Sequence, residues 1–410
     1  MSPCKSSRSI SILLAITLAA CADSAAPVGV DAGSRVDGGD ADAGGLDAGA
    51  ADSGAADSGE AADSGPPDSG LADSGADTTD AGTTDAGALD GGVTFHYDCG
   101  AFSADPGWTV RAGYRAVVVA DATAGLNQPV ALTFAEGGFG GRLFVVCQGD
   151  GTVREVDVAT GAVTVAVGGT GWGTPSPAAL TTITWDAEGI FDGNLYVGDQ
   201  GGDGDADSRI YRIAPGGAAS LFAMAPGAGM DDIYGLAFAP SAGVYASGLY
   251  VTGDTDGAGV DWGIVSATAT IATFSEVAGT EGIAFDPTGL YGDALIASRP
   301  LGGGYAGDGT ITPITTAGAA GTPLATALGG VHAVTFSNGG SFGRSMYAAS
   351  WSAGTLMQIS PTGDITELAS GLTLTNYDGN VLAVSSDGQV MFVADRSANR
   401  IVCIEPVATP

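Results

Sequence analysis

Six apolar pentads recur along the chain about fifty residues apart: VALTF (130–134), TTITW (181–185), YGLAF (234–238), EGIAF (281–285), HAVTF (332–336) and NVLAV (380–384). Each is followed by a glycine-rich turn and a second short apolar segment. A repeat of this period made of β-strand units is typical of a propeller. The sequence therefore predicts an all-β, six-bladed β-propeller in which each pentad forms the innermost strand of one blade.

The last repeat indicates how the ring closes. Its third strand is expected at 400–404, and only EPVATP follows, so no fourth strand remains. Upstream of the first pentad, RAVVVADA (115–122) is a strand without a blade of its own. We expect this segment to complete the last blade, because such pairing removes a sheet edge and joins the two ends of the ring.

The cysteines of the propeller region allow three interpretations. Cys99 precedes the first strand, Cys147 lies in the first blade and Cys403 lies in the last strand. Closure brings the two ends together, which favours a Cys99–Cys403 disulfide in an oxidising compartment. Pairing of Cys147 with Cys403 is the rival, since the first and last blades are neighbours, and three buried unpaired thiols are the third interpretation.

The N-terminus, residues 1–20, has the pattern of an export signal. Lys5 and Arg8 precede an apolar run at 10–20 that is too short to cross a bilayer as a helix. The run ends in LAAC (18–21), which resembles the lipobox of bacterial lipoproteins. The resemblance implies cleavage before Cys21, a lipid on Cys21 that attaches the protein to a membrane, and, with Ala22 next, a place at the outer membrane or cell surface. An ordinary secretory signal is the alternative.

Residues 22–92 differ from the rest of the chain in composition. They are almost wholly Ala, Asp, Gly, Ser and Thr, with five DSG triplets and no aromatic residue. Like charges repel and little apolar surface is available, so we predict a disordered tether at 21–92 that carries the propeller domain of residues 93–410.

Charge and composition exclude several classes of function. The net charge of −33 divides into +2 in residues 1–21, −15 in residues 22–92 and −20 in residues 93–410. An acidic surface repels phosphate backbones, so we expect no nucleic-acid partner. The only lysine is Lys5, which lies in the signal, so chemistry that needs a lysine Schiff base or a P-loop lysine is excluded.

Two stretches resemble known propeller families. Residues 377–406 (YDGNVLAVSSDGQVMFVADRSANRIVCIEP) resemble an NHL-type blade and blades of the gluconolactonase and senescence-marker-protein group. In that lactonase group, acids and asparagines at the starts of the inner strands hold one divalent metal. LYVGDQGG (195–202) is similar to a stretch of six-bladed quinoprotein sugar dehydrogenases, although the histidine motif that precedes it there is missing.

The repeat also selects polar residues expected at the propeller axis. The first pentad positions are Val130, Thr181, Tyr234, Glu281, His332 and Asn380, with Asp232 and Asp378 two residues further out. One interpretation is a divalent metal held by Glu281 and Asp378, with His332 as ligand or catalytic base, acidifying water or polarising a lactone carbonyl. A second is a mouth that binds a ligand without chemistry through Asp232, Tyr234, Glu281, His332 and Asp378. The third is a wet channel with no ligand. Val130 and Thr181 depart from the lactonase pattern.

The loop GDQGGDGDADSR (198–209) is a candidate calcium site. Its alternating carboxylates are Asp199, Asp203, Asp205 and Asp207. Such spacing suits a hard cation that takes six to eight oxygen ligands, although an EF-hand would have Glu where Ala214 stands. A solvated acidic loop is the other interpretation.

The formal GxSxG at 339–343 falls between two antiparallel strands, where a nucleophile elbow cannot form, and is expected to be a hairpin turn. The leading functional hypothesis is therefore a binding module for a small molecule or a protein. The alternatives are a metal-dependent lactonase-like hydrolase and, more weakly, a quinoprotein sugar dehydrogenase.

Overall fold

The chain divides into two units, Met1–Thr83 and Thr84–Pro410. The computed structural model describes parts of the second unit: residues 97–201, 208–225, 230, 232–253, 262–275, 277, 279–299, 309–375 and 379–407. The predicted lipidation site Cys21, the predicted tether, Asp203, Asp205, Asp207 and Asp378 lie outside the described residues. Among the described residues, no helix has the length and apolarity needed to cross a membrane.

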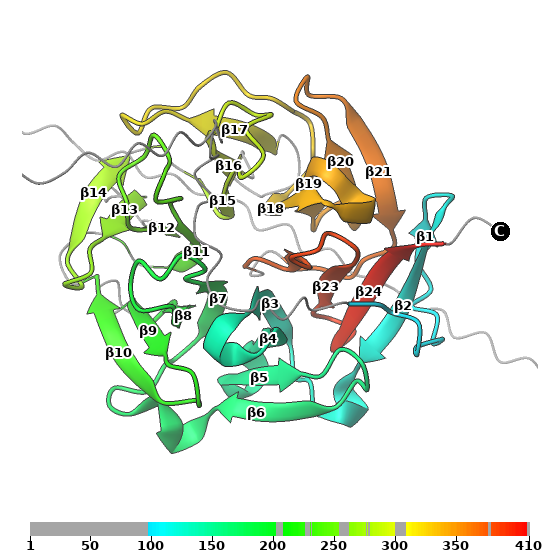
Figure 1. Ribbon diagram of the computed structural model, residues 1–410, viewed down its shortest axis with the longest axis horizontal. Coiled ribbons are helices and arrows are strands. Elements are labelled where there is room, and N and C mark those ends of the chain that lie inside the picture. Colours follow the sequence, from blue (N-terminus) through cyan, green and yellow to red (C-terminus); the bar gives the residue numbers. More distant parts are fainter. Residues whose placement is uncertain are drawn as a thin grey trace, which may run out of the picture. The chain divides into compact units, whose positions relative to one another are not determined.

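Six antiparallel sheets surround a central axis, as predicted (Figure 1). Blade 1 contains β3 (Pro129–Ala135), β4 (Arg142–Cys147), β5 (Thr152–Val156) and β6 (Val163–Val167). Blade 2 contains β7 (Leu180–Trp185), β8 (Leu195–Asp199), β9 (Arg209–Ile213) and β10 (Ala219–Met224). Blade 3 contains β11 (Ile233–Phe238), β12 (Leu249–Gly253), β13 (Trp262–Val265) and β14 (Ile271–Ser275).

The other three blades vary in strand number. Blade 4 has β15 (Ile283–Phe285), β16 (Leu295–Arg299) and β17 (Thr310–Ile314), with two isolated bridges in place of a regular fourth strand among the described residues. Blade 5 has β18 (Val331–Gly339), β19 (Gly343–Ser350), β20 (Thr355–Ile359) and β21 (Ile365–Ser370), and gains β1 (Thr109–Val110) as an additional edge strand. Blade 6 has β22 (Leu382–Val384), β23 (Met391–Asp395) and β24 (Arg400–Pro406).

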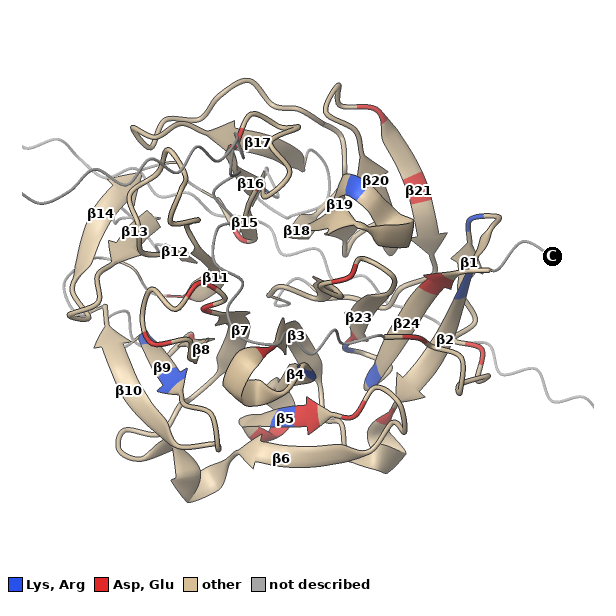
Figure 2. Cartoon of the chain, in the orientation of Figure 1, with Lys and Arg blue, Asp and Glu red and all other residues tan. Residues whose placement is uncertain are grey.

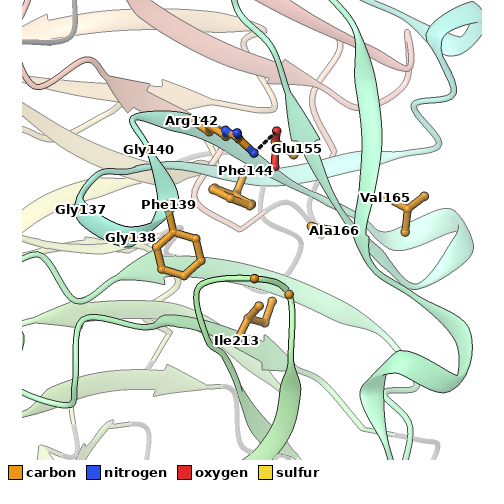
Figure 3. Close-up of a pocket in the computed structure, with 12 residues that line it drawn as sticks. Gly137, Gly138, Phe139, Gly140, Arg142, Phe144, Glu155, Val165, Ala166 and Ile213 are labelled. Carbon is orange, nitrogen blue, oxygen red and sulfur yellow. Dashed lines mark hydrogen bonds and ion pairs between the residues drawn. The ribbon is translucent and has the colours of Figure 1, made fainter. Parts of the chain in front are cut away.

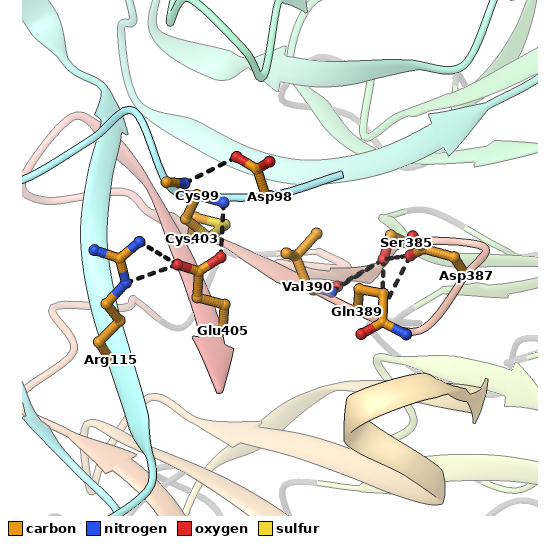
Figure 4. The surroundings of a disulfide bond; sticks show 10 residues. Asp98, Cys99, Arg115, Ser385, Asp387, Gln389, Val390, Cys403 and Glu405 are labelled. Atoms are coloured by element: carbon orange, nitrogen blue, oxygen red, sulfur yellow. Dashed lines mark hydrogen bonds and ion pairs between the residues drawn. A yellow bond between two sulfur atoms is a disulfide. The ribbon is translucent and has the colours of Figure 1, made fainter. Parts of the chain in front are cut away.

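The ring is closed by the N-terminal strand, as the sequence predicted. Strand β2 (Tyr114–Ala120) pairs antiparallel with β24, so the first and last strands of the ring lie side by side (Figure 1). A disulfide joins Cys99 to Cys403 on β24, while Cys147 is a buried free thiol. Glu405 reinforces the junction: its side chain accepts a hydrogen bond from the Cys99 N–H (2.8 Å) and pairs with Arg115 (Figure 4).

Aromatic residues pack between adjacent blades. The turns after the inner strands carry Phe139, Phe191, Tyr245, Tyr291 and Phe342, each of which is buried. The Tyr291 hydroxyl donates to the Ile359 carbonyl of the next blade (2.5 Å) and accepts from the Met346 N–H (3.0 Å). A buried tyrosine that satisfies its hydroxyl in this way fixes one blade against the next while burying a large apolar ring.

Candidate ligand-binding site at the axial mouth

An acid and an imidazole meet at the axis where the inner strands begin. Glu281 lies just before β15 of blade 4, and its Oε2 contacts Nδ1 of His332 on β18 of blade 5. Both side chains are buried, and the His332 ring lies edge-on to Trp351 with centroids 5.9 Å apart. His332 Nε2 is also buried and has no hydrogen-bond partner among the described residues.

Backbone geometry explains why the first pentad residues reach the axis. The pairing of inner and second strands shifts register at Val130, Thr181, Tyr234 and His332, so each of these residues occupies a β-bulge. A bulge adds an unpaired residue and re-aims its side chain. At this position the side chain therefore does not follow the alternation between the two faces of the sheet that the rest of the strand obeys.

Close approach of blades 4 and 5 brings Glu281 and His332 together. A Cβ on Gly282 would lie 2.0 Å from the His332 carbonyl oxygen, so only glycine allows this spacing. The Ser298 hydroxyl bonds the His332 carbonyl and accepts from the Gly282 N–H (2.9 Å), and the Thr252 hydroxyl donates to the Glu281 carbonyl (2.7 Å). The pair is thus held by its backbone on both sides.

Further half-buried side chains lie at the same end of the blades, beside the starts of the inner strands. Each of these side chains belongs to the residue that directly follows the second strand of its blade. Among the described residues these are Gln148, Gln200, Trp351 and Arg396. Arg396 bonds the Gln148 side-chain oxygen and the Thr375 hydroxyl (2.5 Å). Gln148 in turn donates to the Leu180 carbonyl of blade 2 (3.2 Å). We call these four residues, together with Asp232 and Tyr234, the rim.

The rim continues into blade 3. The Gln200 amide lies 3.5 Å from the Tyr234 hydroxyl, which donates to Asp232 Oδ2 (3.0 Å). Thr181, in contrast, is fully buried, and its hydroxyl donates to the Ile233 carbonyl of the adjacent blade. Thr181 therefore joins two blades instead of lining an open mouth, and Val130 is buried as well, which corrects the expectation that all six positions share one opening.

The mouth has a floor. A Cβ on Gly379 would lie 2.1 Å from the Thr181 carbonyl oxygen, although blade 1 separates their blades. The next residue, Asn380, accepts a hydrogen bond from the Leu132 N–H through its carbonyl (2.9 Å). The segment before β22 therefore passes blade 1 and reaches blade 2 near the axis, and we use it as the boundary between an upper mouth and a lower part of the channel.

Asp199 is committed to its own blade. Its Oδ1 accepts from the Ala178 and Ala179 N–H groups (3.0 and 2.7 Å), and its Oδ2 lies 3.4 Å from Arg209. Burial raises the pKa of Asp199, while these donors act in the opposite direction. Asp395 at the end of β23 has the same kind of partner in blade 6, since its Oδ2 pairs with Arg400 at 2.7 Å. The recurrence indicates a structural function for Asp199, and the remaining calcium candidates lie outside the described residues.

The metal hypothesis has two donors in place. Glu281 and His332 are together, but among the described residues no three His, Cys, Asp or Glu side chains cluster closely enough to hold a metal ion. The third expected donor, Asp378, lies outside the described ranges. A divalent site needs further oxygen or nitrogen ligands, so the described residues alone do not form one.

Sequence reasoning selected the inner-strand residues but missed the rim residues Gln148, Gln200, Trp351 and Arg396. The signal that identifies them is their register, one position after the end of each second strand.

The serine of the GxSxG stretch is a turn residue, as expected. Gly340–Phe342 forms a short 3-10 helix, and the Ser341 hydroxyl donates to the Gln389 side chain (2.5 Å).

A further cavity lies on the outer part of blades 1 and 2. It has a volume of about 500 Å³ and is lined largely by glycine turns and apolar side chains (Figure 3). Its charged residues, Arg142 and Glu155, pair with one another at 2.7 Å. Basic positions are few in the ring, and some lie on the third strands of blades, such as β5 and β9 (Figure 2). This cavity offers little unpaired polarity, so the axial mouth is the stronger candidate.

Comparison with known proteins supports the fold. No protein-family model matches the chain, and no curated protein matches it. The structure resembles the aldose sugar dehydrogenase of Escherichia coli in its apo form, with a TM-score of 0.52, 15% identity and coverage of 72% of this chain and 100% of that one. It also resembles a gluconolactonase from Xanthomonas campestris, with a TM-score of 0.51, 13% identity and coverage of 73% and 91%.

A third similar structure is the PQQ-bound aldose sugar dehydrogenase of Streptomyces coelicolor, with a TM-score of 0.50, 18% identity and coverage of 72% and 99%. The chain is thus a six-bladed propeller with structural neighbours among gluconolactonase-like and related propellers. At these identities the likeness concerns the fold alone.

Proposed function

We propose that the protein is a binding module whose axial mouth holds a small, neutral, polyhydroxylated molecule. The observation that carries the proposal is the rim: amide, hydroxyl, indole, carboxylate and guanidinium groups of several blades lie beside the starts of the inner strands, the end of the blades at which Glu281 contacts His332. Amides and hydroxyls both donate and accept hydrogen bonds, which suits a ligand rich in hydroxyl groups.

Charge supports a neutral ligand. The rim includes the acid Asp232 and the base Arg396, and Glu281 contacts His332, so acidic and basic groups both occur at this end of the blades. The overall negative charge of the chain disfavours the approach of an anion. Half-buried Trp351 offers an apolar ring face beside the polar groups, an arrangement common in small-molecule sites.

The proposal is tested by calorimetric titration of the purified protein with D-glucose, D-galactose and myo-inositol. Tyr234→Phe removes a hydroxyl that bonds Asp232 and approaches Gln200, and we expect affinity to fall about tenfold, as for one hydrogen bond in a desolvated site. Tyr114→Phe is the matched control, since Tyr114 lies on β2 beside Phe342. Absence of binding by all three compounds, or equal losses in both variants, would contradict the proposal.

A lactonase-like hydrolase is the second candidate, favoured by the contact of Glu281 with His332. A carboxylate can orient an imidazole that acts as a base. Asp378 would join them if a divalent metal is held. Release of acid from D-glucono-1,5-lactone, followed with and without chelator and in Glu281→Gln, tests this candidate. A rate equal to that of the uncatalysed lactone would reject it.

We also propose that Cys21 carries the lipid anchor and that residues 22–92 space the propeller from a membrane surface. The lipobox-like LAAC and the polar composition of the following segment support this. Growth with a labelled fatty acid should label the natural protein and leave Cys21→Ser unlabelled. Equal labelling of the two proteins would contradict the anchor.

A further inference from the structure

The lower part of the channel, below Asn380, contains two adjoining cavities of about 380 and 200 Å³. Both are lined by Trp185, Thr335 and Asn380, and together they receive residues from all six blades. We call them the lower channel. The larger volume lies within the range of small-molecule sites.

Small residues keep the lower channel open. The fourth position of each pentad lines it, and these residues are Thr133, Thr184, Ala237, Ala284, Thr335 and Ala383. The following position is aromatic in five blades, and these residues line the same space: Phe134, Trp185, Phe238, Phe285 and Phe336. The lower channel therefore combines threonine hydroxyls with a belt of aromatic side chains.

Two polar atoms of the lower channel are left without partners. Asn380 Oδ1 and Trp185 Nε1 are buried and make no hydrogen bond to the described residues. An unsatisfied buried polar group costs roughly 1–3 kcal/mol, and such groups are uncommon in native proteins. A molecule that donates a hydrogen bond to Asn380 would recover part of this cost.

The charged residues of the lower channel are acidic. Glu136 and Glu188 line the cavities, and no Arg, Lys or His is among their lining residues in the described part of the chain. The Glu188 carboxylate also accepts from the Ser241 N–H (2.6 Å), which fixes its position. Aromatic rings with nearby carboxylates attract organic cations, through the ring quadrupole and through direct charge.

We propose that the lower channel binds a compact organic ammonium ion that also carries a hydroxyl or N–H donor. The cationic end lies among the aromatic belt and the two carboxylates, and the donor points inward to Asn380 Oδ1. This site is separated from the axial mouth by the segment Gly379–Asn380 and is independent of the function proposed for that mouth.

The first test uses the natural protein with two probes of the same shape. Choline has the required charge and hydroxyl, and 3,3-dimethylbutan-1-ol is its neutral carbon analogue. Calorimetry and tryptophan fluorescence should show choline binding at least about tenfold more tightly, as expected for a cation among aromatic rings, and weakening as salt is added. Equal affinity of the two probes, or no binding of choline, would overturn the proposal.

Variants then locate the bound cation. Glu188→Gln should weaken choline roughly three- to tenfold by loss of one nearby charge, while Glu367→Gln, at an exposed position of β21, should not. Trp185→Phe should alter affinity and the fluorescence response. Trp108→Phe is its matched control, since Trp108 Nε1 is also buried without a hydrogen-bond partner in the described part of the chain, but lies beside Arg400.

The outcomes separate this site from the mouth. Loss of choline binding in Tyr234→Phe, with full binding in Glu188→Gln and Trp185→Phe, would place the cation at the mouth and overturn the proposal. Binding that is unaffected by all three changes would overturn it as well. Circular dichroism melts of each variant establish that the fold is retained.

Discussion

Replacing Cys99 and Cys403 by alanine removes a covalent bond between the N-terminal segment and the last blade. The bond closes a loop with a sequence separation of 304 residues. By the chain-entropy relation, constraining an unfolded loop of this length corresponds to about 5.7 kcal/mol at 25 °C. We expect the double variant to lose about 4 kcal/mol of unfolding free energy, since the unfolded chain retains some structure.

The assay is reversible unfolding in urea, followed by circular dichroism and tryptophan fluorescence. The double variant should also show a larger dependence of unfolding free energy on denaturant, because its unfolded chain exposes more surface. Thermal scans should show a fall of the melting temperature of about 10 °C. Reduction of the natural protein should reproduce these changes and should leave the double variant unaffected.

Cys147→Ala is the control, since Cys147 is buried and unpaired. This change should lower the unfolding free energy only by the amount expected for removal of a small buried side chain. It should not change the dependence of the unfolding free energy on urea. The reasoning is refuted if the double variant retains its stability to within about 1 kcal/mol. Reduction that destabilises the double variant as much as the natural protein would refute it too.

Three other predictions concern the axis and the core. Glu281→Gln should lower the free energy of unfolding by about 3 kcal/mol, because it leaves His332 unpaired in a buried site. A double-mutant cycle with His332→Gln should show coupling between the two side chains. Additive effects would contradict the interaction of the pair. Gly379→Ala should destabilise the fold by roughly 1–3 kcal/mol through overpacking. Gly171→Ala should not, because its Cβ would meet its nearest neighbour at 3.6 Å. Equal effects of the two changes would contradict the close approach of Gly379 to blade 2. Burial raises the pKa of Tyr250 to about 12, so the folded state holds its proton more tightly than the unfolded state, and stability should fall as pH rises from about 10 through 12. Tyrosinate absorbance and urea melts check this, and a Tyr250 that ionises near its ordinary pKa would contradict it.

The blades and their closure could be predicted because they depend on apolar periodicity. Strands β3, β7 and β18 each contain the pentad expected to form them, and β2 occupies most of the expected closing segment. The two-residue strand β1, which extends blade 5, carries no such pattern and was not predicted. A strand so short is defined by its tertiary neighbours, which local sequence does not encode.

The site could be predicted only in part. The pentad register selected Glu281, His332 and Tyr234, but it could not show that Thr181 turns its hydroxyl to the neighbouring blade. The reason is the bulge at this position, which breaks the two-residue alternation on which sequence reasoning depends. The position of the segment before β22 likewise depends on its contacts with blades 1 and 2, which are far from it in sequence.

Amide hydrogen exchange with bound sugar tests the central claim of a ligand site at the axial mouth most directly. With the tightest-binding sugar at saturation, exchange should slow at the peptides that contain Gln148, Gln200, Tyr234 and Trp351, while the peptides of the outer strands stay unchanged. Slowed exchange confined to the ends of the inner strands, or no change at the rim peptides despite calorimetric binding, would contradict the claim.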